Sequence, residues 1–399
     1  PGCAQKLSDT TGSSGYLSPQ IFPCTSINEK DVVFGGVKKL ESTIANALKV
    51  IDADLYVVLT GCIPEIVGDD VADVVSKFSD AEKPVVFAPT AGFKGNNYKG
   101  HEQVVEAIVT QYLKKSDDKQ KGLVNIWADV PYQDLFWLGN IRELENLLTE
   151  IGLTPNTIFG YQRGIENINK IPHAEFNLLV SPWVGLKNMK TMEKTLGIPY
   201  LHYPVLPVGA TETGKFLREV GKFANIDEGK VEAVIKKHED YFYYLISRYA
   251  DLFLENRVIN KQFSVVADAQ YSLAITKFLV NDLGLTPAKQ FVTDDTPKEY
   301  QEAIKAEFNN LNFGIKADVA FETDGFKIHE AIKEHDYHGY PLVLGGYYEK
   351  ELTEKLKGNF LNISWPVLDK VVFDDFYVGY TGGIRLIEDI YTVAVQRFN

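Results

Sequence analysis

The feature of this 399-residue chain that most constrains its fold is a repeated alternation of short apolar runs with longer amphipathic stretches. The runs have the length of buried strands, and the stretches between them carry apolar residues near helical spacing. Strands that alternate with helices in this way indicate βαβ units and parallel sheets. We therefore predict an α/β protein with mostly parallel central sheets flanked by helices.

The predicted elements follow directly from these runs. The strands are Leu55–Leu59, Val85–Ala88, Val124–Trp127, Thr157–Phe159, Phe176–Val180, Tyr200–His202, Phe263–Ala267, Gln290–Val292, Val319–Phe321, Leu342–Leu344 and Phe360–Ile363. The helices are Lys38–Val50, Glu102–Lys114, Ile141–Ile151, Gly185–Leu196, Thr211–Val220, Glu228–Asp251, Ala269–Asp282, Pro297–Phe308, Gly325–Glu334 and Tyr347–Leu356.

This number of units is too large for one doubly wound sheet of ordinary size, so the chain is expected to divide. We predict three Rossmann-like domains, with limits 1–118, 119–256 and 257–399. The first join, near Ser116–Gly122, is charged and is expected to be an exposed linker. The second join is expected near Asn256–Lys261.

The net charge of −13 argues against two classes of partner. An acidic surface repels both nucleic acid and anionic membranes, so neither is expected as a partner. No apolar stretch approaches the roughly 20 residues that a bilayer span needs. Three cysteines in so long a chain favour a reducing cytoplasm over a disulfide scaffold.

The most informative short segment surrounds Cys62, where the predicted strand Leu55–Leu59 ends at Thr60-Gly61. The carboxyl end of a strand in a parallel sheet is where ligands bind. A thiol at that point can face a crevice. The chain's three cysteines (Cys3, Cys24 and Cys62) either are buried small hydrophobic residues or contribute to a metal centre.

Two glycine-rich segments are expected near the same edge of the first sheet. Gly35-Gly36 immediately precedes a predicted helix, and such a pair either binds an anion, admits another body close to the backbone, or forms an ordinary tight turn. The segment Gly92-Phe93-Lys94-Gly95 follows the predicted strand Val85–Ala88.

Several common catalytic motifs are absent from the sequence. There is neither a G-x-G-x-x-G fingerprint after a strand nor a Walker A loop, so nucleotide hydrolysis by this chain is not expected. His335 and His338 have the spacing of a metal-ligand pair, but the following Gly-Tyr-Pro favours a surface loop. Asp69-Asp70 after Cys62 either shapes a metal environment or supplies acidic residues at a helix start.

These segments resemble the nitrogenase component 1 family. The resemblance rests on Glu29–Gly36 with Lys38-Lys39-Leu40, and on Thr60–Asp70 around Cys62. Pro1-Gly2-Cys3 is similar to the end of that family's His-Gly-x-x-Gly-Cys segment. Gly92–Gly95 is similar to its Ser-Phe-x-Gly loop, with glycine in place of serine. Two later segments, Pro207–Glu212 and Val378–Gly383, resemble β-type chains.

The resemblance implies an iron-sulfur cluster shared at a subunit interface, of the [4Fe–4S] or P-cluster type. Cys3 and Cys62 match two of the family's three ligand positions, and Cys24 is kept as a further candidate. The remaining ligand position lies upstream of Pro1, and we expect that a preceding segment is missing from this sequence. The residues expected to line the cluster are Gly2, Gly35, Gly36, Gly61 and Phe93. A [4Fe–4S] cube usually takes four thiolates, so this chain alone is short of ligands.

The resemblance also implies a role. The strand Phe176–Pro182 has no cysteine and residues 358–399 have no histidine, so the ligands of the family's large catalytic cofactor are missing. We therefore expect a β-type or nitrogenase-like oxidoreductase subunit. It would pass electrons from an ATP-dependent iron-protein reductase to a reducible substrate, together with a second subunit. The alternatives are a scaffold for cofactor maturation and a metal-free protein that binds small ligands.

Overall fold

The strands of the protein form three parallel sheets. The computed structural model describes residues 23–255 and 261–396, and every strand pair found there is parallel. The first sheet pairs β1 (Tyr56–Leu59) with β2 (Val85–Ala88). The second has the order β4 (Thr154–Asn156), β3 (Gln120–Trp127), β5 (Ala174–Val180) and β6 (Tyr200–Tyr203). The third has the order β10 (Val319–Phe321), β9 (Gln290–Val292), β7 (Gln262–Ala267), β11 (Leu342–Gly345) and β12 (Asn359–Asn362), and β8 (Thr286–Pro287) also pairs with β7.

Helices follow nearly every strand, as βαβ units require. They are α2 (Glu29–Phe34), α3 (Val37–Val50), α4 (Cys62–Val67), α5 (Val71–Ser76), α6 (Asn97–Ala107), α7 (Trp137–Ile151), α8 (Ile165–Lys170), α9 (Leu186–Leu196), α10 (Gly209–Phe223), α11 (Glu228–Glu255), α12 (Ala269–Asn281), α13 (Lys298–Phe308), α14 (Gly325–Glu334), α15 (Lys350–Lys355) and α16 (Gly379–Gln396). Shorter turns are η2 (Gly92–Lys94), the π-helical η3 (Ile108–Tyr112), η4 (Ile171–His173), η5 (Asn312–Gly314) and η6 (Tyr347–Glu349). Across the described ranges, none of these helices is both long and apolar enough to span a bilayer.

The predicted α/β class and its parallel sheets are confirmed, and most predicted elements agree with the structure within a few residues. The predicted position of one strand was wrong, because β4 occupies Thr154–Asn156 instead of Thr157–Phe159. Thr157 has left the sheet and its hydroxyl donates to Glu145 at 2.7 Å. The helix predicted from Glu102 begins at Asn97, where the Asn96 side chain caps the helix by accepting from the Lys99 amide.

The C-terminal helix α16 was not predicted, because its first turn is rich in glycine, a poor helix former. The structure shows why glycine is there. A Cβ at Gly382 would lie 2.2 Å from the Tyr377 backbone, and one at Gly383 would lie 2.7 Å from Cα of Gly209. Glycine at Gly383 therefore allows α16 to pack closely against the start of α10, and glycine at Gly382 allows its first turn to lie against the preceding Tyr377 backbone.

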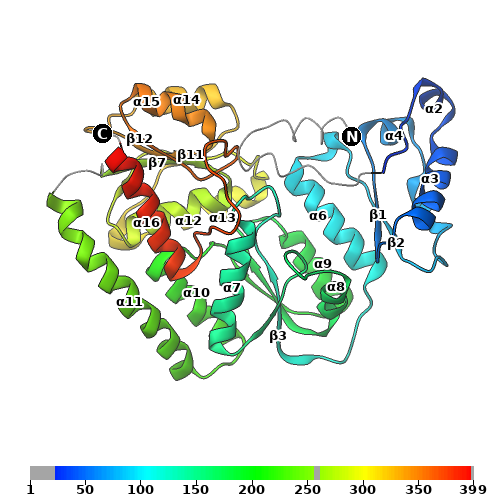
Figure 1. Cartoon of the computed structure of the whole chain (residues 1–399), viewed down its shortest axis with the longest axis horizontal. Helices are drawn as coiled ribbons and strands as arrows, with labels where there is room; N and C mark the ends of the chain where they lie inside the picture. Colours follow the sequence, from blue (N-terminus) through cyan, green and yellow to red (C-terminus); the bar gives the residue numbers. More distant parts are fainter. Residues whose placement is uncertain (1–22, 256–260, 397–399) are drawn as a thin grey trace.

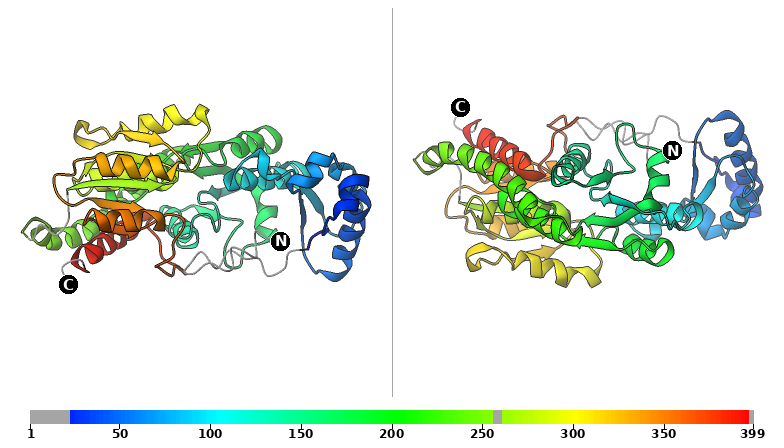
Figure 2. Two further views of the ribbon diagram at one scale, coloured as in Figure 1. Left: turned by 90° about the horizontal axis from the view of Figure 1, so that it is seen from above. Right: turned by 90° about the horizontal axis from the view of Figure 1, so that it is seen from below.

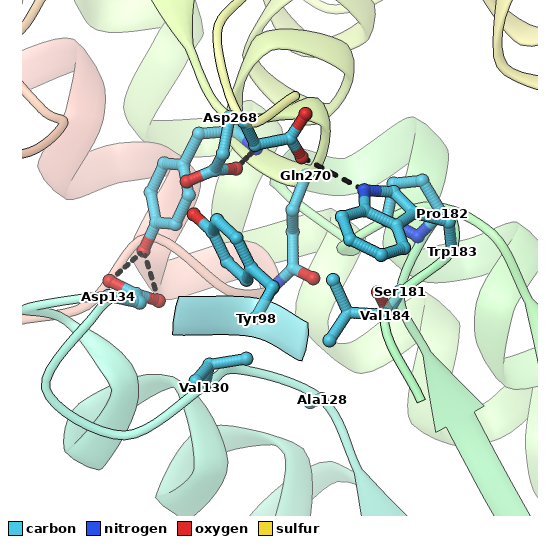
Figure 3. A pocket seen from close by; sticks show the side chains of 12 residues that line it. Tyr98, Ala128, Val130, Asp134, Ser181, Pro182, Trp183, Val184, Asp268 and Gln270 are labelled. Carbon is cyan, nitrogen blue, oxygen red and sulfur yellow. Dashed lines mark hydrogen bonds between the residues drawn. The ribbon is translucent and has the colours of Figure 1, made fainter. Parts of the chain in front are cut away.

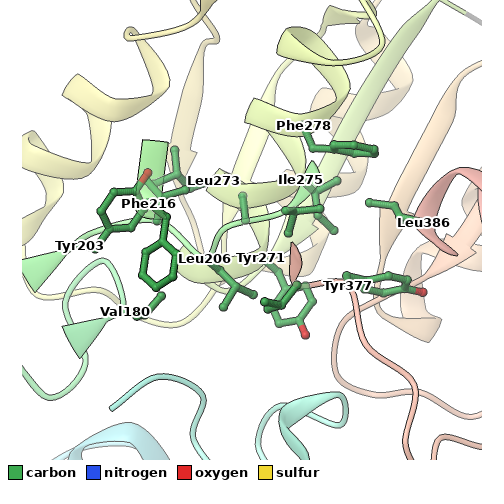
Figure 4. Close-up of a cluster of buried hydrophobic side chains, with 14 of the residues drawn as sticks. Val180, Tyr203, Leu206, Phe216, Tyr271, Leu273, Ile275, Phe278, Tyr377 and Leu386 are labelled. Carbon is green, nitrogen blue, oxygen red and sulfur yellow. The ribbon is translucent and has the colours of Figure 1, made fainter. Parts of the chain in front are cut away.

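The second and third sheets share one hydrophobic core. Its side chains come from both sheets and from the helices between them, including Val180 on β5, Phe216 on α10, Leu273 on α12 and Leu386 on α16 (Figure 4). The helix α16 lies across α7, α10 and α11 and so returns the chain end to the second sheet (Figure 1). These two sheets therefore form one packed body.

The first sheet has a small core of its own, built from Ile44, Val71, Val74 and Val75. Both further views place this sheet and helices α2 to α5 at one end of an elongated molecule (Figure 2). The helix α6 connects this end to the rest of the chain (Figure 1). The domain limits at 118 and 256 remain a prediction; the three sheets fall within residues 56–88, 120–203 and 262–362.

Candidate metal centre

Cys62 is the first residue of α4, directly after the turn Thr60-Gly61 that ends β1. Its thiol is free and its side chain is exposed. The sequence predicted a thiol at the end of a strand. The structure places it there, because β1 ends at Leu59 and α4 begins at Cys62. An exposed sulfur at this position can bind a group that another body helps to enclose.

The turn that carries Cys62 is held by polar contacts. Glu65 forms an ion pair with Lys94 and accepts a hydrogen bond from the Thr60 hydroxyl. Thr90 donates to the Thr60 carbonyl at 3.1 Å. Burial raises the pKa of Glu65, but the contacts with Lys94 and Thr60 outweigh it and hold that pKa below its ordinary value. Glu65 is therefore a stable carboxylate that fixes the loop beside the thiol.

The loop after β2 lies against the thiol, as the sequence predicted. A Cβ built on Gly92 would lie 3.4 Å from Sγ of Cys62. Glycine at this position therefore leaves open the space beside the sulfur. Phe93, the next residue, is exposed.

The pair Gly35-Gly36 separates α2 from α3 and receives a carboxylate of the chain itself. Both side-chain oxygens of Asp69 accept from the Gly36 amide, each at 3.0 Å. A Cβ at Gly36 would lie 2.8 Å from Asp69 Oδ2, so a side chain there would displace the carboxylate from the Gly36 amide. The missing side chain at Gly36 thus lets Asp69, in the loop that follows α4, come close to the backbone between α2 and α3.

Of the two roles predicted for the neighbouring Asp70, the structure shows that of an acidic residue at a helix start. It is the N-cap of α5, where its side chain accepts from the Asp73 amide at 2.9 Å. Such a contact satisfies a backbone donor that the first helical turn leaves free. Asp69 and Asp70 are therefore both committed to local structure.

Cys24 and Cys62 line one large cavity of about 1020 Å³ beside β1, together with Gly36 and Gly61. Cys24 is exposed, and its Sγ lies 3.3 Å from the Ser26 hydroxyl. That hydrogen bond holds the pKa of the Cys24 thiol below its ordinary value. A lower pKa favours the thiolate, which is the form that binds metals.

The predicted ligand Cys3 and the predicted lining residue Gly2 lie outside the described residues. Within the part of the chain that the structure describes, no three cysteine, histidine or carboxylate side chains converge on one point. Two thiols on one cavity are a donor set that suits an iron-sulfur group, but they are fewer than the usual four. The described residues thus fit one side of a shared site.

An apolar surface lies beside Cys62 and is contributed by two short helices and one loop. Helices α2 and α4 are in contact and lie together at the far end of the first sheet (Figure 1). The exposed side chains that form it, called here the thiol-side surface, are Val32, Val33, Phe34, Ile63, Ile66, Val67 and Phe93. Large exposed apolar side chains that gather on neighbouring elements are typical of protein interfaces.

The crevice between the second and third sheets holds no thiol among the residues described. Asn177 on β5 is fully buried, and its side-chain oxygen accepts from Asn125 at 2.9 Å and from Trp127 at 3.1 Å. His202 on β6 is tied to the Ser181 carbonyl at 2.8 Å, and burial lowers its pKa. The described strand ends therefore offer neither a thiolate nor a free imidazole here.

The sequence reasoning missed a group of four buried or half-buried aspartates in this same crevice. They are Asp129 and Asp134 after β3, Asp268 after β7 and Asp294 after β9. Asp134, Asp268 and Asp294 line a small cavity, in which Figure 3 labels Asp134 and Asp268. The available signal was an aspartate one or two residues beyond a predicted strand, as in Ala267-Asp268 and Thr293-Asp294.

The fold and the thiol-bearing strand end together define a class of protein, and comparisons with known proteins agree. A model of the family "Nitrogenase component 1 type Oxidoreductase" matches residues 1–394. The chain therefore belongs to the nitrogenase component 1 family of oxidoreductases.

Two kinds of relative are similar to the chain. It is 24% identical to the nitrogenase molybdenum-iron protein beta chain of Clostridium pasteurianum, over 97% of this chain and 85% of the relative. It is 26% identical to a light-independent protochlorophyllide reductase subunit of Angiopteris evecta, over 63% of this chain and 51% of the relative. The alignment to this second relative thus spans about half of that relative's length.

A solved structure, "Nitrogenase Cp1 at pH 6.5", matches the fold with a TM-score of 0.77 and 22% identity. The match covers 94% of this chain and 82% of that one. At this identity the likeness concerns the fold alone.

Proposed function

We propose that this chain is a partner-type subunit of a nitrogenase-like iron-sulfur oxidoreductase. Cys62 ligates an iron-sulfur cluster at the interface with a second nitrogenase-like subunit, and Cys3 and Cys24 are the further candidate ligands. The observation that carries the proposal is the exposed thiol of Cys62 beside the thiol-side surface. A cluster at such a place is enclosed only when the partner subunit covers it.

The residues of this chain then have distinct tasks. Cys62 supplies a thiolate, and Gly92 leaves room beside it because a Cβ there would reach 3.4 Å from the sulfur. Glu65 and Lys94 fix the position of the loop. The apolar side chains exclude water, and a dry surrounding tunes the reduction potential of an iron-sulfur group. The cluster supplies one-electron transfer when it is bound.

The proposal also includes partners and a compartment. An ATP-dependent iron-protein reductase delivers electrons, and the reducible substrate binds at the interface or on the second subunit. The free thiols of Cys24 and Cys62 suit the reducing cytoplasm. Domains with limits 1–118, 119–256 and 257–399 complete the proposed organisation, with the cluster on the first.

The test is Cys62→Ala in protein purified without oxygen. We expect loss of iron and weaker assembly, with the melting temperature of the separated chain unchanged, because the exposed side chain at a strand exit contributes little to the core. Binding that occurs only in the assembled state stabilises assembly by mass action. Iron content, mass in solution and thermal melting measure the three effects.

Cys24→Ala is the matched comparison, because it removes a second exposed thiol from the same cavity. Loss of iron in both variants makes both residues ligands, whereas loss in Cys62→Ala alone restricts the described ligand to Cys62. Full iron content and intact assembly in Cys62→Ala would contradict the proposal.

A further inference from the structure

The first sheet is open on one side. Parallel strands are normally covered on both faces, as β11 is, where all residues of the strand are buried. In β1, none of the residues in the apolar run Tyr-Val-Val-Leu is buried, and Leu59 is 46% exposed. A continuous apolar strand that stays half-exposed indicates that a further segment of protein covers it.

The open side of this sheet is the free edge of β1. Across residues 23–255 and 261–396, β1 pairs with β2 and with no other strand. The far edge of β2 is occupied, because the Gln111 side chain donates to the Phe87 carbonyl at 2.8 Å and accepts from the Phe87 amide at 2.9 Å. Most sheets have more than two strands. The edge of β1 is therefore the side on which a further strand can be added.

The cavity of about 1020 Å³ lies beside this strand. Helix α3 contributes Leu40, Ile44 and Ala47 to its wall, and β1 contributes its whole length. The volume is far more than a few bound water molecules need, and most of the lining side chains are apolar. Apolar walls favour an apolar occupant, because burial of both surfaces removes them from water.

The chain itself supplies another wall of the cavity. Residues 23–27 line it, and Lys39 of α3 holds this stretch by donating to the Ser26 carbonyl at 2.7 Å. The residues before Pro23 lie outside the described part of the chain, but residue 22 is bonded directly to this wall. No other segment of the chain is joined to the cavity in this way without already being part of its described surroundings.

The composition of the preceding segment suits the cavity. Residues 16–22 carry the large apolar side chains Tyr16, Leu17, Ile21 and Phe22 and no charged side chain. Residues 1–15 are mostly polar or glycine, and Leu7 is their one large aliphatic residue. The apolar part of the segment is thus the part nearest to the cavity wall.

We propose that residues 16–22 occupy the cavity and complete the first sheet along the free edge of β1. Extended, these residues span roughly 23 Å, whereas β1 spans roughly 13 Å, so the segment is long enough to follow the strand. Pro19 has no amide hydrogen to donate, which is compatible with the outermost strand of a sheet. The apolar side chains of the segment then lie against α3 and β1.

The occupied cavity has a consequence for the thiols. Cys24 and Cys62 both line it, so the docked segment shields them from water on this side. The thiol-side surface stays open to a partner subunit. The docking itself needs neither a cluster nor a partner, so it can be tested whether or not the proposed function holds.

A photo-crosslinking group tests whether this segment is the occupant. It is introduced into the full chain as p-benzoylphenylalanine in place of Leu17, and the protein is irradiated at low concentration. The expected product joins position 17 to α3 or β1 of the same chain, as mapped by mass spectrometry of its peptides. The same group in place of Leu7 is the control and is expected to give no such product. Products that join position 17 only to a second copy, to a partner chain or to other elements would overturn the proposal.

Ile21→Asp in the full chain measures what the segment contributes to β1. A charge is costly in an apolar cavity, so we expect the β1 amides to exchange hydrogen at least about tenfold faster than in wild type. We also expect more binding of the apolar dye anilinonaphthalene sulfonate, because the cavity becomes accessible. Leu7→Asp is the matched control and is expected to behave like wild type in both measurements.

Unchanged exchange and unchanged dye binding in Ile21→Asp would overturn the proposal, because the segment would then contribute nothing to the cover of β1. Equal changes in Ile21→Asp and Leu7→Asp would also overturn it, since the effect would not be specific to residues 16–22. The crosslinking result requires no destabilised variant, so it decides between the outcomes if Ile21→Asp does not fold.

Discussion

At the scale of single residues, the contact between Asp69 and Gly36 links the two segments that carry the family resemblance. The residues are 33 positions apart, and the Asp69 carboxylate lies where any side chain at Gly36 would be. The contact also anchors the chain that leaves α4, the helix that begins at Cys62. This contact gives a structural reason for glycine at position 36 that requires no bound ligand.

Gly36→Ala is therefore expected to destabilise the protein by about 1–3 kcal/mol, because the added methyl group would displace the Asp69 carboxylate and weaken its hydrogen bond with the Gly36 amide. Gly61→Ala is the matched control, since Gly61 has similar φ and no atom within 4 Å of its added Cβ. We expect it to change stability by less than about 0.5 kcal/mol. Urea unfolding measures both, and equal losses would contradict the steric explanation.

At the scale of elements, α2 and α4 each present an apolar face to solvent. Neither helix has a buried residue, although α2 ends in Val32, Val33 and Phe34. Helices of one to two turns gain little stability by themselves. Their exposed faces are more consistent with a surface that a second subunit covers.

Val33→Asp is expected to weaken assembly at least about tenfold, because a charge would replace an apolar contact of more than about 1.4 kcal/mol. Val50→Asp is the control, because Val50 is also a highly exposed valine, at the end of α3 and outside the thiol-side surface. Mass in solution as a function of concentration reports the effect. If both variants assemble like wild type, α2 is not part of the interface.

At the scale of the whole molecule, stability depends on how the second and third sheets are joined. Tyr271 of α12 is buried in this junction, and its hydroxyl accepts from Asn140 of α7 at 2.8 Å. Asn140 in turn accepts from the Tyr377 amide at 3.1 Å, in the segment that leads into α16. One hydrogen-bond network thus connects three distant parts of the sequence.

Tyr271→Phe removes only the hydroxyl from this network. We expect a loss of about 1–3 kcal/mol in the free energy of unfolding, because the buried Asn140 and Asp134 lose a partner. Tyr241→Phe, at an exposed position, is expected to stay within about 0.5 kcal/mol of wild type. Faster hydrogen exchange in both α7 and α12 of the first variant would show that the loss is at the junction; exchange confined to α12 would argue against it.

The sequence by itself determined the parallel α/β class, most strand ends and the position of Cys62 after a strand. These features depend on the spacing of apolar residues and on glycine turns within a few positions, so neighbouring residues are enough to read them. The tertiary structure decided the contact of Asp69 with Gly36, the helix α16 and the four aspartates between the sheets. Each of these depends on residues that are far apart in the chain, and burial changes what a carboxyl group or a glycine does there. A local pattern carries no information on that burial, because only the path of the folded chain brings the partners together.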